Sequence, residues 1–157
     1  MVKTTTTLLI AAIALAANAN ANPMPKGAVP MTPEAILALY ADHTAIWDAG
    51  SEAYFAADGS VRGYAKNRWV FWGKISQTGN EICMNNQGMD SKTKKSDGKT
   101  TSDCWKWVTA ADGKPWTLYS KAFDNRKLDL VKGWYEETKN LKPGNLAAVK
   151  YSAMGGQ

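Results

Sequence analysis

The residues of this sequence that could carry out chemistry include one histidine, two cysteines and fourteen aspartates and glutamates. A general base at His43 would need a partner and a substrate pocket, and a lone histidine at a helix end is more often a cap or a surface residue. The sequence has no G-x-S-x-G elbow to present a serine nucleophile. Adjacent acids such as Glu136 and Glu137 do not by themselves form the carboxylate pair of a glycosidase. We therefore predict that the protein is not an enzyme, with a small hydrolase as one alternative.

Three aspartates of one polar stretch, Asp90, Asp97 and Asp103, are the candidates for binding a cation. Their spacing lacks the alternating ligands of an EF-hand, and no glutamate closes the stretch. Four lysines in the same stretch would repel a hard cation. Two cysteines and one histidine cannot supply the four ligands of a structural zinc site. We predict no metal and no cofactor, and a metal-ion carrier that uses these aspartates is an alternative.

The aromatic side chains give a more specific signal, because the chain contains seven tryptophans. Trp69 and Trp72 lie three residues apart in a strand-like run, so they point to opposite faces. One of them must lie outside the core or line a cavity. An exposed tryptophan with an apolar body and a polar tip suits a sugar ring or an amphiphile, and ordinary packing is the alternative. The predicted ligand-binding residues are aromatic and basic side chains: Trp72, Trp105, Trp107, Tyr64, Arg62, Arg68 and Lys106.

The charge of the chain indicates the kind of partner. The formal net charge is +5, and removal of Lys3 with an N-terminal leader would leave +4. A positive protein attracts anionic partners. Because export makes nucleic acid an improbable partner, we predict an anionic glycan or other envelope polymer, or a small amphiphile. The remaining alternative is a protein-interaction module or enzyme inhibitor that binds another exported protein through the polar stretch 85–103.

The first 21 residues have the features of a cleaved signal peptide. Lys3 precedes an apolar stretch from Leu8 to Ala17, and Ala19-Asn20-Ala21 is a small-x-small cleavage site. About ten apolar residues are too few for a bilayer core that needs about 20. We predict cleavage after Ala21 and a periplasmic or secreted protein.

Export also decides how the two cysteines are interpreted. In an oxidising compartment Cys83 and Cys104 favour a structural disulfide. The bridge would close a loop of about 22 residues and contribute about 3 kcal/mol in the chain-entropy account. A redox-active pair is less favoured, because the C-x-x-C spacing that tunes a thiol pKa is missing.

The elements that must position these residues are mostly strands. Thr32, Pro33 and Glu34 predict a helix start, with an end near Asp42 or His43. Asp58-Gly59 is a strong hairpin signal. Strand candidates lie at 53–57, 60–66, 68–75, 81–84, 104–108, 116–120 and 127–131, with a long polar loop at 85–103. The pattern predicts a mainly β fold, a small antiparallel barrel or sandwich (a lipocalin-like meander) with one short N-terminal helix.

The domain boundaries follow from composition. Residues 22–31 form an extended proline-rich segment, residues 32–141 a single β-rich domain, and residues 142–157 a tail of small residues that we expect to be flexible.

A pattern of residues across this domain is similar to a known family. It includes Trp47, Gly50, the segment Tyr54-Phe55-Ala56-Ala57-Asp58-Gly59, Gly63-Tyr64, Arg68-Trp69 and the turn from Asn80 to Cys83. The chain resembles domain-of-unknown-function family number 995, a family of small exported alphaproteobacterial proteins, over about residues 34–125. The resemblance implies a periplasmic β-rich domain, and it transfers no catalytic residue.

Overall fold

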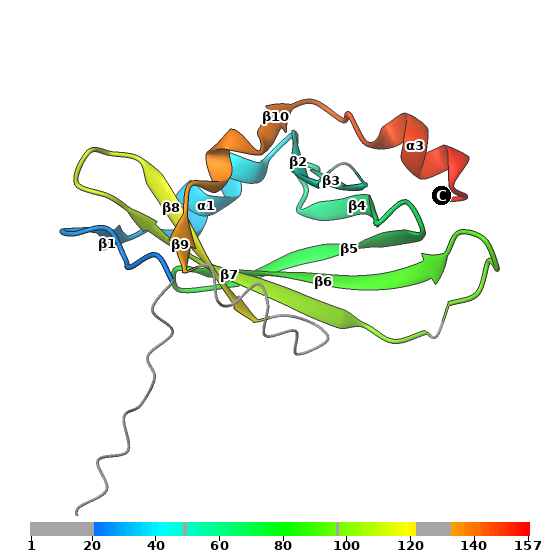
Figure 1. The fold of residues 1–157 in the computed structure, drawn as a ribbon, viewed down its shortest axis with the longest axis horizontal. Helices are drawn as coiled ribbons and strands as arrows, with labels where there is room; N and C mark the ends of the chain where they lie inside the picture. Colours follow the sequence, from blue (N-terminus) through cyan, green and yellow to red (C-terminus); the bar gives the residue numbers. More distant parts are fainter. Residues whose placement is uncertain (1–20, 49, 97, 122–132) are drawn as a thin grey trace, which may run out of the picture.

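A single antiparallel sheet dominates the structure, a computed structural model that describes residues 21–48, 50–96, 98–121 and 133–157 (Figure 1). Its strands are β1 (Val29–Pro30), β2 (His43–Asp48), β3 (Ser51–Phe55), β4 (Ser60–Ala65), β5 (Trp69–Thr78), β6 (Glu81–Asp90), β7 (Thr101–Thr109), β8 (Pro115–Lys121), β9 (Trp134–Tyr135) and β10 (Leu141–Pro143). Their order across the sheet is β10-β2-β3-β4-β5-β6-β7-β8-β9, with β1 paired to the end of β7. The helical elements are α1 (Pro33–Tyr40), the 3-10 helix η1 (Glu137–Lys139) and α3 (Ala148–Ala153).

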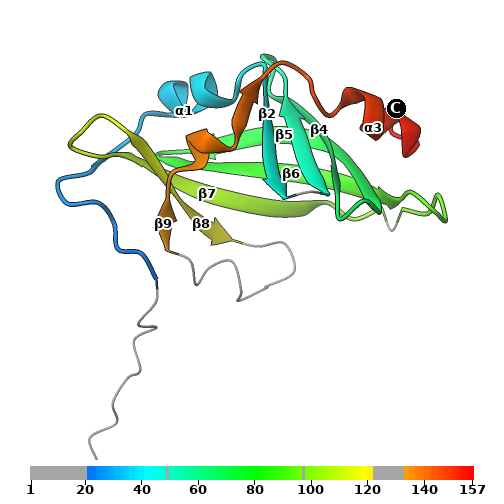
Figure 2. The same cartoon turned by 45° about the horizontal axis from the view of Figure 1, so that its top comes forward.

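The sheet curls into a half-barrel, as Figure 2 shows. Consecutive strands from β2 to β9 are neighbours, which is the meander that the turn spacing predicted. The segment β9–η1–β10 connects the last strand in the order, β9, to the first, β10. The Ile46 N–H of β2 donates to the Asn140 carbonyl of this segment at 3.0 Å. The prediction of a mainly β fold is confirmed, and the alternative that the structure favours is the barrel.

The inner face of the half-barrel holds the main hydrophobic core. Helix α1 and strands β2, β3, β4, β6 and β7 contribute ten buried residues to it: Ile36, Tyr40, Ala45, Ala53, Phe55, Val61, Ile82, Met84, Trp105 and Trp107. We call the opposite side of the sheet the outer face. The Tyr40 ring packs against the rings of Phe55 and Trp107, at centroid distances of 4.6 and 5.7 Å. The predicted helix is therefore α1, and it packs on this core because an isolated eight-residue helix would not be stable.

The C-terminal segment differs from the prediction of a flexible tail. Residues 141–143 form β10, and α3 packs on the outer face of the sheet. Ala147 and Tyr151 join Tyr64 and Val70 in a second buried cluster. The small residues of this segment gave no indication of packing in the sequence. Two buried side chains, Ala147 and Tyr151, are nevertheless enough to hold the short helix against a strand.

The predicted polar loop is shorter than its residue types suggested. Strand β6 extends to Asp90 and β7 begins at Thr101, so residues 91–100 connect them. Cross-strand pairing extends both strands although the side chains are polar, because pairing satisfies the backbone amides and carbonyls.

The predicted disulfide is present. Cys83 and Cys104 are direct cross-strand partners on β6 and β7 and form a bridge. Residues 1–20 of the predicted leader and the strand expected at 127–131 lie outside the described residues. No helix in the described ranges is long and apolar enough to cross a membrane.

Candidate functional site

A groove lies between the C-terminal half of α1, the β3–β4 turn and strand β5. Helix α1 is fixed at its start by the Thr32 hydroxyl, which accepts a hydrogen bond from the Ala35 N–H at 3.3 Å, and by Pro33 at the first helical position. Ile36 and Tyr40, one turn apart, bury the helix face that meets the core. Leu37, beside them, is left at the groove.

The β3–β4 turn forms the second wall. Gly59 has φ +78°, a conformation that favours glycine, and no atom lies within 4 Å of the position of a Cβ there. The Gly59 N–H donates to the Ala56 carbonyl, and the Ile75 N–H donates to the Gly59 carbonyl, both at 2.9 Å. The second bond ties the turn to β5. The wall is therefore built by the Ala-Ala-Asp-Gly part of the segment on which the family resemblance rests.

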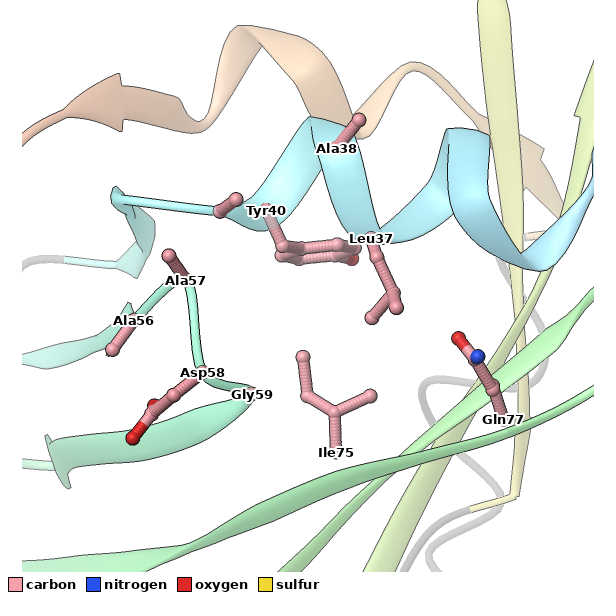
Figure 3. Close-up of a pocket in the computed structure, with 10 residues that line it drawn as sticks. Leu37, Ala38, Tyr40, Ala56, Ala57, Asp58, Gly59, Ile75 and Gln77 are labelled. Carbon is pink, nitrogen blue, oxygen red and sulfur yellow. The ribbon is translucent and has the colours of Figure 1, made fainter.

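The groove has a volume of ≈ 390 Å³ and is open to solvent along one side. Figure 3 shows Leu37 and Tyr40 of α1 pointing toward Ile75 of β5. Its lining consists of Leu37, Ala38, Tyr40, Ala41, Ala56, Ala57, Asp58, Gly59, Ile75 and Gln77. The lining is mainly apolar, and its polar groups are the Tyr40 hydroxyl, one carboxylate and one amide.

The carboxylate of Asp58 and the amide of Gln77 lie on different sides of the groove (Figure 3). The Asp58 carboxylate accepts from the Ser60 N–H at 2.8 Å. Hydrogen bonds from Ser60, with a smaller contribution from the Lys74 ammonium, hold the pKa of Asp58 below its ordinary value. Asp58 therefore carries a negative charge at neutral pH, whereas Gln77 can both donate and accept a hydrogen bond.

Two of the predicted binding residues, Trp105 and Trp107, lie in the core. They share the inner face, as the alternation along β7 predicted, and they are 7% and 0% exposed. Trp105 stacks between Trp47 and Tyr119, at ring centroid distances of 6.3 and 5.2 Å. In the sequence, neither the number of tryptophans nor the position of Trp105 and Trp107 on a strand could distinguish packing from binding. Their burial places both side chains in the packed core.

Tyr64 is also buried, at 2% exposure, although it lies on the outer face. Helix α3 covers it, and the Lys150 ammonium lies 4.6 Å from the centre of its ring. Burial is the main reason why the pKa of Tyr64 is raised, with a further contribution from Glu52. A ligand could reach this ring only if α3 moved.

Arg62 and Trp72 are the two predicted residues that the structure brings together. They are direct cross-strand partners on β4 and β5, both exposed, with Trp72 at 36%. Strand alternation places Lys74 on the same outer face, and Gln87 is the partner of Trp72 on β6. This exposed patch combines an indole, two cations and an amide.

The other two predicted residues are elsewhere. Arg68 lies in the β4–β5 turn, where its Nε and Nη2 atoms are each 2.7 Å from Oδ2 of Asp90. Lys106 is exposed on the outer face of β7, opposite Glu81. The seven predicted residues therefore do not form one binding surface. The alternation of residues along a strand shows which side chains share a face. It does not show which face borders the core or where α3 covers the sheet.

The aspartates considered for a cation site do not converge in the part of the chain that the structure describes. Asp90 is the partner of Trp69, whereas Asp103 is the partner of Met84, six residues away along β6 or about 20 Å. The Asp103 carboxylate accepts from the Tyr119 hydroxyl, and Asp97 is not among the described residues. The structure therefore contradicts a joint site of Asp90 and Asp103.

Two titratable groups considered for catalysis have structural contacts. His43 is the first residue of β2, and its Nδ1 lies 2.7 Å from the Ala41 carbonyl oxygen. Glu137 is 1% exposed and accepts hydrogen bonds from Trp47 Nε1 at 2.8 Å and from Asn140 Nδ2 at 3.2 Å. Burial raises the pKa of Glu137. Nothing in the sequence distinguishes Glu137 from its neighbour Glu136, which the structure pairs with the exposed Lys139.

The groove residues were missed by sequence reasoning for a related reason. Leu37 and Ile75 belong to elements that were predicted, but their proximity depends on how α1 crosses the sheet. The short side chains of Ala56 and Ala57 beside a predicted turn were the signal that could have indicated open space.

Comparisons with known proteins give one match. A family model described as "Protein of unknown function (DUF995)" matches residues 6–135, most of the chain. No curated protein matches, and no solved structure matches. The family description assigns no ligand, reaction or site residue.

Proposed function

The chain belongs to the DUF995 family of proteins of unknown function, and on that premise we propose that it is an exported, non-enzymatic module that binds a small amphiphile. The observation that carries the proposal is the ≈ 390 Å³ groove beneath α1, with its mainly apolar lining. Ligand pockets of small molecules are typically about 300–1,000 Å³ and are lined by apolar side chains with a few polar groups. The groove has both properties.

The shape of the groove indicates how an amphiphile would lie in it. An apolar body fits between Leu37 and Tyr40 on one side and Ile75 on the other. A polar head would lie at the solvent-exposed side, within reach of the Gln77 amide. The charge of Asp58 favours a head that donates hydrogen bonds.

Two features support export. The first 21 residues have the charge, apolar stretch and small-x-small site of a signal peptide. The Cys83–Cys104 disulfide is typical of a protein from an oxidising compartment. The periplasm, or the medium outside the cell, would also give the protein access to amphiphiles released from membranes.

A non-enzymatic role is supported by the contacts of the titratable groups. His43 Nδ1 is occupied by the Ala41 carbonyl, and Glu137 is enclosed with Trp47 and Asn140. Neither group lines the groove. A binding module needs neither, because an apolar ligand is held by burial of its surface.

The exposed pair of Arg62 and Trp72 favours a second candidate, an anionic glycan bound on the outer face. An indole can stack on a sugar ring while Arg62 and Lys74 pair with its acidic groups. Replacing Arg62 and Trp72 together with alanine should then weaken binding of an anionic polysaccharide such as polygalacturonate by at least about tenfold. Binding of an amphiphile in the groove should not change.

The groove is tested by filling it. Ala57 and Ala111 each begin an Ala-Asp-Gly turn and each is exposed, so Ala57→Trp and Ala111→Trp form a matched pair. Only Ala57 lines the groove. Titration with the fluorescent amine N-phenyl-1-naphthylamine, an apolar molecule whose N–H donates a hydrogen bond, should show saturable binding to the parent protein and to Ala111→Trp. Ala57→Trp should bind at least about tenfold more weakly. Equal binding by both variants, or no saturable binding by the parent protein, would contradict the proposal.

A further inference from the structure

Three segments meet at one end of the sheet, which we call the basic end. They are residues 66–69 around the β4–β5 turn, residues 90–100 at the β6–β7 loop, and α3 (Figures 1 and 2). The Ser91 N–H donates to the Arg68 carbonyl at 2.8 Å, and the Lys94 ammonium donates to the Met154 carbonyl at 2.9 Å. These bonds connect the loop to the turn and to the end of α3.

The basic end carries most of the net charge of the protein. Residues 66–69 and 90–100 contain six cations and two acids, a net charge of +4 out of +5 for the whole chain. The cations are Lys66, Arg68, Lys92, Lys94, Lys95 and Lys99. Lys150 of α3 supplies the remaining +1, so the rest of the chain has no net charge. The electrostatic field is therefore concentrated at this end.

One of the two acids is already neutralised. Asp90 is buried, pairs with Arg68 at 2.7 Å, and accepts hydrogen bonds from the backbone N–H groups of Lys92 and Thr93. The hydrogen bond from Arg68 is the main reason why its pKa is lowered. Asp90 therefore stabilises the conformation of the β6–β7 hairpin that carries the four lysines of the loop.

An exposed aromatic side chain lies among these cations. Trp69 is 44% exposed, with the Arg68 guanidinium 5.4 Å from the centre of its ring. Lys150 of α3 is a further cation at this end, and its ammonium donates to the side chain of Asn67 in the β4–β5 turn. The basic end is therefore amphipathic.

We infer that the basic end docks the protein onto an anionic lipid bilayer. Lysines and arginines near a bilayer surface are attracted by anionic headgroups, and tryptophan prefers the boundary between headgroups and acyl chains. A soluble polyanion would use the cations but would leave Trp69 exposed to water. The cations lie on a projecting loop and an adjacent turn, an arrangement that fits a planar, fluid surface. This inference does not depend on a ligand in the groove.

The test is sedimentation of the folded protein with lipid vesicles. Vesicles of phosphatidylcholine with about one third phosphatidylglycerol should bind the protein at low salt, and binding should fall steeply as salt is added. Vesicles of phosphatidylcholine alone should bind at least about tenfold more weakly. Equal binding to both kinds of vesicle would overturn the inference.

Two variants of equal net charge separate the basic end from charge in general. The first replaces Lys92, Lys94, Lys95 and Lys99 with glutamine, and the control replaces four exposed lysines elsewhere, Lys26, Lys106, Lys121 and Lys142. The first variant should lose at least about tenfold in vesicle binding, and the control at most about twofold. Equal losses in both would show that net charge alone governs binding and would overturn the inference.

The apolar part is tested by Trp69→Ala, with Trp72→Ala as its control on the same strand. Trp69→Ala should weaken vesicle binding by about fivefold, whereas Trp72→Ala should leave it unchanged. A protein that binds polygalacturonate or another soluble polyanion as strongly as vesicles, and is insensitive to Trp69→Ala, would show recognition of a polymer instead. Circular dichroism spectra that match the parent protein confirm that each variant is folded.

Discussion

Substituting Gly73 with alanine is expected to destabilise the protein strongly, because the backbone of β6 lies very close to Gly73 of β5. Gly73 is the direct partner of Asn86 on β6. A Cβ added to Gly73 would overlap the carbonyl oxygen of Asn85 and lie 2.8 Å from its carbonyl carbon. Both are backbone atoms, so no side-chain rotation can relieve the overlap. Gly88 provides a matched control on the paired strand, since a Cβ there would lie 3.4 Å from the Val70 carbonyl oxygen, an ordinary contact.

The magnitude follows from these contacts. Overpacking typically costs about 1–3 kcal/mol, and a backbone overlap that opens two strands belongs at the upper end, so we expect Gly73→Ala to lose about 3 kcal/mol. Gly88→Ala should be neutral or gain up to about 1 kcal/mol, because alanine reduces the entropy of the unfolded chain. In a domain of this size the loss corresponds to a fall in Tm of about 10 °C.

Urea unfolding followed by circular dichroism measures both variants directly. The free energy of unfolding in water, extrapolated for each variant, should differ between them by about 3 kcal/mol or more. If the two variants agreed within about 0.5 kcal/mol, the close approach of β5 and β6 at Gly73 would be refuted.

Three further predictions use the same unfolding measurement. Because the pKa of buried Glu137 is raised, protonation of this carboxyl favours the folded state; the stabilisation is full below the ordinary pKa of a glutamate and is lost as pH rises through the raised pKa. Glu137→Gln should therefore have a higher free energy of unfolding than the parent protein at neutral pH. This difference in free energy should shrink as pH falls toward the ordinary pKa. Trp107→Ala should lose about 3–5 kcal/mol, whereas Trp72→Ala should stay within about 0.5 kcal/mol; similar losses in both would contradict the burial of Trp107. Replacing Cys83 and Cys104 together with serine should lower the free energy of unfolding by about 3 kcal/mol, and an unchanged value would show that the bridge contributes little.

Local features of the fold were predictable because they depend on a few neighbouring residues. The start of α1 depends on Thr32 and Pro33, and the β3–β4 turn depends on Asp58 and Gly59. The disulfide was predictable because the chain has two cysteines, so each has one possible partner. In each case the determining interaction lies within a short segment or involves a single possible partner.

The candidate sites were predictable only in part. Alternation along β7 placed Trp105 and Trp107 on one face, but it could not show that this face is the core. Arg62 and Trp72 were selected as aromatic and basic residues, and their pairing arises from the register of β4 and β5. Register is set by the whole meander, which single residues do not encode.

The sequence by itself determined the mainly β meander, the helix start, the main turns, the disulfide partners and the excess of positive charge. These follow from local backbone preferences, from the alternation of side chains and from composition. Only the tertiary structure decided that the tryptophans of β7 are buried, that α3 covers Tyr64, that a groove opens beneath α1 and that the charge gathers at one end. The physical reason is that burial and proximity depend on how the sheet curls and which elements cover it, and those contacts join residues far apart in the chain.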